Sequence, residues 1–168
     1  VQPPSAAGVS RNVYAQFDVP QGGAILNNAR TDVQTQLGGW VQANPWMKEG
    51  SARVILNEVN SSNPSRLQGF VEVAGPRAET VIANPAGIVV DGGGFINVSR
   101  ATLSTGAPQM VDGRLTGFDV QRGLIAIEGA GLNASQTDYT ALIARSVQLN
   151  AGLWAQRADA ARNILEGG

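Results

Sequence analysis

The stretch TVIANPAGIVVDGGGFINV, residues 80–98, alternates short apolar runs with tight turns. The runs at 80–83, 88–90 and 95–98 are rich in β-branched and aromatic residues, which favour strands. They are separated by Asn84-Pro85 and by the glycine-rich segment 91–94. Proline presets φ in such turns, and glycine tolerates positive φ. This stretch predicts an all-β fold made of short strands and tight corners.

The same pattern continues on both sides of this stretch. The chain has 168 residues, of which 21 are glycine and only 5% are aromatic, a composition typical of many short strands joined by turns. Helical periodicity is weak except over Trp154–Leu165, where an Ala- and Arg-rich segment predicts a short helix. Further strands are expected at residues 13–19, 24–26, 53–59, 69–73, 115–120, 124–127, 141–144 and 147–149.

Prolines recur at similar intervals along the chain, which indicates a corner about every 20 residues. The series consists of Pro20, Pro45, Pro64, Pro85 and Pro108. Three of these prolines follow an asparagine, whose side chain can cap a turn. Such a regular period in an all-β chain favours a solenoid whose coils stack on one another, a β-helix.

A sandwich or barrel is the alternative fold, because its usual strand spacing also occurs here. Such folds need hairpins, and the only Asp-Gly candidates for a two-residue hairpin turn are Asp91-Gly92 and Asp112-Gly113. In a β-helix, alternate strand residues face the interior. The interior is expected to contain Val54, Leu56, Ile88, Val90, Ile96 and Leu103, with an inward ladder of Asn27, Asn57, Asn133 and Asn150.

The composition excludes several classes of function. The chain has no Cys and no His, so disulfides, thiolate nucleophiles, imidazole bases and zinc sites built on these residues are absent. Twelve basic and 13 acidic residues give a net charge of −1 without any block of like charge. This balance argues against nucleic acid or an anionic membrane as the main partner.

Three other sets of residues suggest chemistry, but each has a simpler structural interpretation. Asp91 to Gly94 resembles a phosphate cradle but lacks the following Lys-Ser/Thr, so a coil corner is favoured. Four carboxylates are candidates for a sugar-cleaving pair, although solvated strand faces are the simpler explanation for them: Glu58, Glu72, Glu79 and Asp91. The three tryptophans can stack on sugar rings but more often fill cores or corners: Trp40, Trp46 and Trp154.

Several blocks, taken in order, resemble the hemagglutination-activity, or two-partner-secretion, domain. They are SARVILNEV (51–59), NPAGI (84–88) and GGGFINVSRATL (92–103), and the resemblance runs from about Gly8 to Trp154. The family includes the amino-terminal parts of filamentous hemagglutinin, secreted hemolysins and contact-dependent growth inhibition effectors. The resemblance implies a right-handed parallel β-helix.

Two short signatures of the family, NPNL and NPNGI, have counterparts here. The first corresponds to Asn44-Pro45-Trp46-Met47 and the second to Asn84-Pro85-Ala86-Gly87-Ile88. Trp46 and Met47 replace a small polar and an aliphatic residue, and Ala86 replaces an asparagine. The resemblance implies that these nine residues form surface or corner turns that affect export.

The resemblance also implies what the chain does and where its boundaries lie. It predicts a secretion domain, residues 1–156, with capping strands shortened before Ala7; residues 157–168 are either a helical cap or the end of the domain. The implied partner is an Omp85-type (TpsB) outer-membrane transporter with periplasmic POTRA domains. We expect a monomeric domain without catalytic residues, cofactor or metal, exported by a Gram-negative bacterium as part of a much longer adhesin, hemolysin or toxin. Any signal peptide is expected to precede Val1.

Two functions from other classes remain open at this point. The first is an adhesive surface module that binds glycans or receptors, which as an isolated folded domain should bind cells or sugars. The second is a β-helical carbohydrate enzyme, which requires a cleft with clustered carboxylates.

Overall fold

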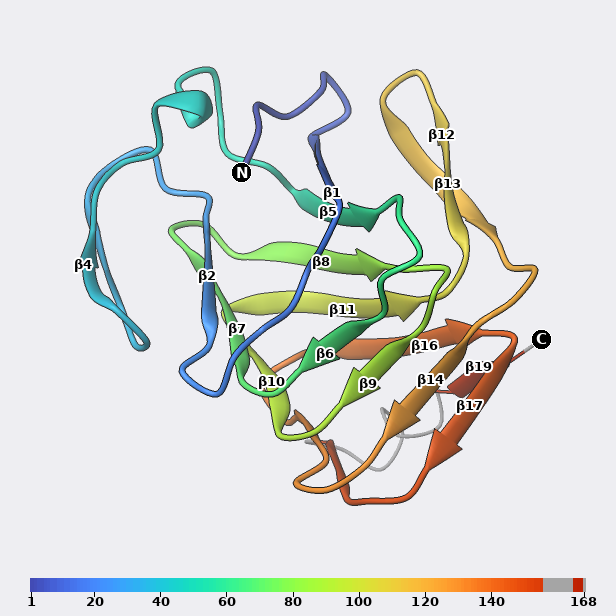
Figure 1. Cartoon of the computed structure of the whole chain (residues 1–168). Helices are drawn as coiled ribbons and strands as arrows, with labels where there is room; N and C mark the ends of the chain where they lie inside the picture. Colours follow the sequence, from blue (N-terminus) through green and yellow to red (C-terminus); the bar gives the residue numbers. More distant parts are fainter. Residues whose placement is uncertain (156–164, 168) are drawn as a thin grey trace.

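Strands of only three to seven residues alternate with corners along the chain. In the computed structural model, which describes residues 1–155 and 165–167, strands one coil apart pair in parallel and form a β-helix (Figure 1). Three parallel sheets, here called A, B and C, are each built from strands that stack in sequence order. The predicted β-helix is therefore confirmed, and the sandwich or barrel is not observed.

The three sheets form the three sides of the coil. Sheet A consists of β1 (Val9–Tyr14), β5 (Val54–Val59), β8 (Ala78–Ala83), β11 (Val98–Ser104), β16 (Tyr139–Ala144) and β19 (Leu165–Gly167). Sheet B consists of β6 (Ser65–Leu67), β9 (Ile88–Val90), β14 (Leu124–Ile127) and β17 (Ser146–Leu149), and Val19 bridges to Leu67 at its edge. Sheet C consists of β2 (Ala24–Asn27), β7 (Phe70–Ala74), β10 (Gly93–Ile96), β15 (Leu132–Ala134) and β18 (Leu153–Ala155).

Coils of different lengths stack without loss of register. Thr80 pairs with Ala101, and Ala101 pairs with Thr140. The coil between the second pair of residues is almost twice as long in sequence as the coil between the first pair. The longer coil contains an antiparallel hairpin, β12 (Ala107–Val111) and β13 (Arg114–Asp119), which projects from the helix (Figure 1). A second insertion precedes β5 and comprises β3 (Val33–Thr35), β4 (Gly39–Val41) and the 3-10 helix η1 (Pro45–Met47). Because strands pair from coil to coil, their hydrogen bonds run along the helix axis.

The interior is filled by inward-facing side chains, most of them apolar, from all three sheets. Asn57, Ile82, Leu103 and Leu142 occupy the same row of sheet A on successive strands, and each is fully buried. From sheets B and C, the fully buried interior residues include Ile88, Val90, Ile125, Ile127 and Phe95. The predicted interior positions of Ile88, Val90 and Leu103 are confirmed.

Three of the predicted interior residues face outward, which corrects the expected register. Ile55 belongs to the interior cluster, so its neighbours Val54 and Leu56 point away from it. Phe95 is the inward residue of its strand, and Ile96 faces an external groove. The sequence did not reveal this because the outward positions of these strands are also apolar, being covered by the inserted hairpins.

Some predicted strand and corner limits were also wrong. The strand expected at 13–19 corresponds to β1, which ends earlier, at Tyr14. A corner follows, where the rings of Tyr14 and Phe17 meet edge to face, and Phe17 and Val19 are buried. Pro108 lies within β12 and not at a corner, because the Asp112-Gly113 pair forms a hairpin turn with φ of 51° and 71°. The predicted helix at 154–165 begins within β18 and ends at β19, and residues 156–164 lie outside the described part.

A buried carboxylate fastens the first inserted hairpin to the helix. Glu72 faces outward from β7 and is only 5% exposed. Its two oxygens accept hydrogen bonds from the backbone N–H of Gln36 at 3.0 and 2.9 Å, and one also accepts from the N–H of Leu37 at 2.9 Å. Bonds from N–H groups to a charged acceptor are stronger than neutral ones. Glu72 thus holds the turn between β3 and β4 against sheet C.

The described residues contain no helix that is long and apolar enough to cross a membrane.

Replacing Ile88 with alanine tests the interior register. Because Ile88 is completely buried, Ile88→Ala should lower the free energy of unfolding by about 2–5 kcal/mol. Val89 lies next to it and faces outward, so Val89→Ala should cost less than about 1 kcal/mol. Denaturant titration of both purified variants measures the difference, and equal losses would refute the assigned register.

Replacing Glu72 with glutamine tests the hairpin attachment. Glu72→Gln preserves size but removes the charge-assisted bonds to Gln36 and Leu37, so we expect a loss of about 1–3 kcal/mol. Hydrogen exchange at these two amides should accelerate. Glu58, whose carboxylate pairs with the exposed Arg11 at 2.9 Å, supplies the control, because Glu58→Gln should cost at most about 1 kcal/mol. Unchanged exchange at Gln36 and Leu37 would show that the hairpin is held by other contacts.

Candidate functional site

The three Asn-Pro pairs all lie at turns between strands, as predicted. Asn44-Pro45 begins η1 between β4 and β5, Asn63-Pro64 joins β5 to β6, and Asn84-Pro85 joins β8 to β9. The second and third pairs occupy the same corner, from sheet A to sheet B, on successive coils. The first lies away from that corner, beside the inserted hairpin β3–β4 (Figure 1). The two family signatures are therefore not brought together.

Asn84 connects its own turn to the coil before it. Its side chain is fully buried. The Oδ1 atom accepts the backbone N–H of Ala86 at 3.0 Å, and Nδ2 donates to the carbonyl of Asn63 at 2.8 Å and to Ser65 Oγ at 2.9 Å. The backbone N–H of Gly87 donates to the Asn84 carbonyl at 3.1 Å, which completes the turn. Gly87 has φ of 118°, a conformation that favours glycine.

Asn44 uses the same bonding plan at the other turn. It is 8% exposed, and its Oδ1 accepts the N–H of Trp46 at 3.0 Å. Its Nδ2 donates to the carbonyls of Val1 at 3.0 Å and Asn27 at 2.8 Å. Each signature asparagine therefore caps the start of its turn through Oδ1 and satisfies acceptors from other segments through Nδ2.

The other signature residues differ in accessibility. Met47, Gly87 and Ile88 are buried, and Pro85 and Ala86 are half-buried. Pro45 and Trp46 are exposed, and the exposed fraction of Trp46 is 59%. In the folded domain a partner can reach the first turn at Pro45 and Trp46, but it cannot reach either asparagine.

Sequence reasoning missed other asparagines that play equivalent roles. Asn28, fully buried, donates from Nδ2 to the carbonyls of Ala52 at 2.9 Å and Pro76 at 3.0 Å, and accepts from the N–H of Ala52 at 2.7 Å. Asn97 donates to the carbonyls of Val73 at 2.7 Å and Gly75 at 2.8 Å, at the end of β7, and has φ of 59°. The sequence signal for these roles is only that each asparagine ends or follows a short apolar run.

The predicted asparagine ladder was wrong in its members. Asn27 and Asn133 lie in sheet C, Asn57 lies in sheet A, and Asn150 follows β17. The observed pair is Asn12 and Asn57, which are register partners on β1 and β5. Asn12 donates to the Leu56 carbonyl at 3.3 Å, and Asn57 donates to the Val81 carbonyl at 3.1 Å, each bonding to the next coil.

The four carboxylates considered for catalysis are held by separate structural partners. Glu58 pairs with Arg11, Glu72 accepts the hairpin amides, and Asp91 accepts the N–H of Ala130 at 2.9 Å. Glu79 lies 3.6 Å from Arg100, and burial raises its pKa above the usual value despite the opposing effect of that arginine. The Asp91–Gly94 segment is a corner and strand start in which Gly92 has φ of 88°. The folded chain thus gives these groups structural roles.

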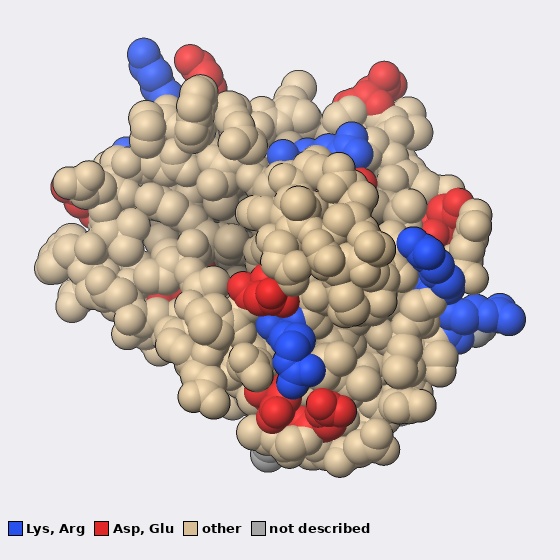
Figure 2. Space-filling model, viewed as in Figure 1, with Lys and Arg blue, Asp and Glu red and all other residues tan. Residues whose placement is uncertain are grey.

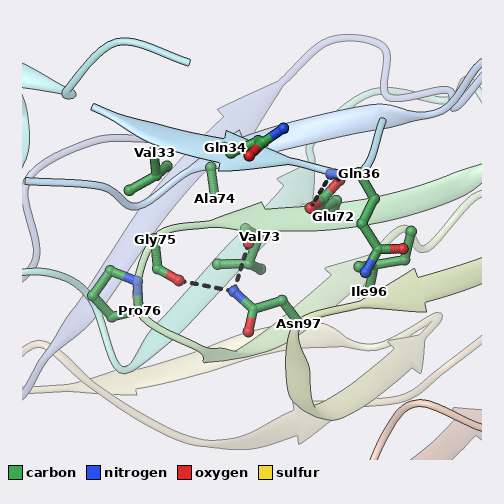
Figure 3. A pocket seen from close by; sticks show the side chains of 10 residues that line it. All are labelled: Val33, Gln34, Gln36, Glu72, Val73, Ala74, Gly75, Pro76, Ile96 and Asn97. Atoms are coloured by element: carbon green, nitrogen blue, oxygen red, sulfur yellow. Dashed lines mark hydrogen bonds between the residues drawn. The ribbon is translucent and has the colours of Figure 1, made fainter. Parts of the chain in front are cut away.

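The surface offers a polar groove and mixed charge. The groove, about 570 Å³, lies between β3 and the ends of β7 and β10 in sheet C (Figure 3). It is lined by Val33, Gln34, Gln36, Glu72, Val73, Ala74, Gly75, Pro76, Ile96 and Asn97. Figure 2 shows acidic and basic side chains interspersed on the visible face, without a patch of one sign. Among the described residues, no three His, Cys, Asp or Glu side chains are grouped to bind a metal ion.

Comparisons with known proteins agree with this architecture. The family model described as the TPS secretion domain matches residues 1–166. The chain is 59% identical over 155 residues to "Toxin CdiA" of Yersinia pestis, covering 92% of this chain and 5% of that protein. It is 56% identical over 155 residues to "tRNA nuclease CdiA-2" of Burkholderia pseudomallei, covering 91% of this chain and again 5% of that protein. The chain thus spans about one-twentieth of the length of these relatives.

A solved structure gives the same result for the fold. The crystal structure of the filamentous hemagglutinin secretion domain superposes with a TM-score of 0.89 at 40% identity, covering 94% of this chain and 52% of that one. Together with the stacked parallel sheets and the family match over nearly the whole sequence, this shows that the chain belongs to the TPS secretion domain family.

Proposed function

We propose that this domain directs a large exoprotein to an outer-membrane transporter of the Omp85 (TpsB) type, whose POTRA domains engage the chain before it folds. The transporter recognises the segments around Asn44 and Asn84 in an extended chain, which can add a strand to a POTRA sheet edge. The β-helix then forms outside the cell, where its first coils act as a template for later ones.

One observation carries this proposal: most residues of the two signatures are inaccessible once the domain has folded. Asn84 and Ile88 are fully buried, and Asn44 is 8% exposed. Side chains in these positions are available to a partner only in the unfolded chain. Recognition before folding agrees with this burial and with the chain's membership of a secretion domain family.

The remaining activity lies outside this chain in our proposal. The relatives are named as toxins and RNA nucleases, and the matched region is 5% of each. The domain itself catalyses nothing and needs no cofactor, and the exoprotein is secreted or displayed on the surface of a Gram-negative cell. Expressing the exoprotein together with candidate TpsB transporters, and measuring its release, tests which transporter serves it.

A second function, adhesion, is favoured by the exposed tryptophans near the first signature. Trp40 is 72% exposed and Trp46 is 59% exposed, so neither fills the core or a corner as expected. Exposed aromatic rings of this kind stack on sugars. The two functions separate cleanly: an adhesive module binds cells or glycans as the purified folded domain and loses that binding in Trp40→Ala, whereas a secretion domain needs no such binding.

Substitution of the signature asparagines tests recognition. Asn84→Ala removes three hydrogen bonds from a buried site, which should cost about 1–3 kcal/mol. The amount of exoprotein released by cells that carry the cognate transporter should fall much further than this loss explains, most of all in the Asn44→Ala, Asn84→Ala double variant.

The matched control for this experiment is Asn28→Ala. Asn28 is also fully buried and makes three hydrogen bonds to backbone groups, but it lies outside both signatures. Its variant should lose similar stability while retaining most of its release. An equal fall in release for Asn28→Ala and Asn84→Ala, or undiminished release from the double variant, would leave both turns as ordinary corners.

A further inference from the structure

Sheet A buries apolar side chains on its outer face as well as on its inner face. Val9, Leu56, Val81 and Ala83 point away from the interior, yet they are between 0% and 5% exposed. They come from β1, β5 and β8, the first three strands of the sheet. An outward face on a β-helix is normally solvated, so something must cover this one.

The cover is the hairpin β12–β13, which is inserted after the fourth strand of the sheet. Met110, Leu115 and Phe118 pack against the outer cluster of sheet A. Their exposed neighbour Val111, at 58%, is on the same hairpin but outside this contact. Residues 107–119 therefore complete the burial of strands that come much earlier in the chain.

The tip of the hairpin is also tied to the beginning of the chain. Ser5 Oγ donates to the carbonyl of Gly113 at 2.7 Å, a contact between residues 108 positions apart. The same Oγ accepts the N–H of Val9 at 3.2 Å, at the start of β1. A Cβ added to Gly113 would lie 2.7 Å from the Cβ of Ser5, so the two segments are in close contact. The hairpin (Figure 1, upper right) thus extends back across sheet A to the first coil.

We propose that the β12–β13 hairpin is a clasp that must close before β1, β5 and β8 become stable. A simple solenoid gains stability one coil at a time through contacts between neighbours. Here the early coils retain an apolar outer face until the hairpin arrives, and long-range contacts of this kind delay folding because chain entropy must be lost first. Folding of the first three coils therefore waits until residues 107–119 are free to close over them.

This inference rests on the proposed function for its biological meaning. A domain recognised before folding must stay unfolded until enough of it has crossed the membrane. The hairpin accounts for this delay. When only the first three coils have crossed the membrane, residues 107–119 are not yet available to cover their outer face. The folding experiments below use the purified chain without a transporter, so they succeed or fail independently of the recognition proposal.

The first experiment uses the absence of cysteine in the chain. Val81 lies under the hairpin, and its neighbour Ile82 lies in the interior of the helix. In Val81→Cys and Ile82→Cys, a thiol reagent reports when each position becomes accessible under native conditions. If the clasp opens only together with the early coils, the two thiols should react within about threefold of each other, after correction for each variant's measured stability. A reaction tenfold or more faster in Val81→Cys would show that the hairpin opens alone, and would overturn the proposal.

The second experiment weakens the clasp directly. In the Leu115→Ser, Phe118→Ser double variant, amide exchange over Val9–Tyr14 should accelerate at least tenfold, since the outer face of β1 and β5 loses its cover. Val111→Ser, on the exposed part of the same hairpin, should leave that exchange unchanged. Full protection of the β1 amides in the double variant would contradict the proposal; if the variant does not fold, the thiol comparison decides the question.

Discussion

Side-chain amides that bond from one coil to the next are the interaction on which this fold depends. A coil of about 20 residues must turn three times, and each turn leaves backbone groups that neither its own strand nor its neighbour can pair. Asn84 bonds to the preceding coil, Asn28 bridges two segments, and Asn97 donates to two carbonyls of the preceding coil. Short strands can therefore stack in register, and the aliphatic interior forms as a consequence of that stacking.

The same bonds explain why the signature residues have two distinct states. In the folded domain, Asn44 and Asn84 are occupied with backbone carbonyls and N–H groups, and Ile88 is part of the interior. In the unfolded chain all three are accessible. A residue used for recognition in one state and for folding in the other would release its partner as the domain folds, because the two sets of contacts exclude each other.

Much of the fold could be predicted from sequence, because corners have strong local signals. Asn-Pro and glycine-rich turns marked the boundaries of β8, β9 and β10, and Ile88, Val90 and Leu103 were placed correctly in the interior. The inward or outward direction of β5 was not predictable, because Leu56 is covered by a hairpin from far along the chain and both faces of that strand are buried. Pro108 was wrongly included among the regularly spaced corners, because the hairpin that contains it is an insertion and not part of a coil. The partners of each asparagine depend on which coils become neighbours, which no local pattern reveals.

Because the backbone hydrogen bonds run along the helix axis, tension along that axis pulls directly on the bonds between coils. Because each coil contacts only its neighbours, we expect tension applied along this axis from the carboxyl-terminal side to load the bonds between one pair of coils at a time. The coil formed by β16, β17 and β18 contacts the coil before it through such bonds and through interior side chains such as Leu142. The strands from β1 to β8 have two additional contacts outside the helix, the bond from Ser5 to Gly113 and the packing of Phe118 against their outer face. We therefore expect the coil of β16, β17 and β18 to separate from the domain at a lower force than the strands from β1 to β8.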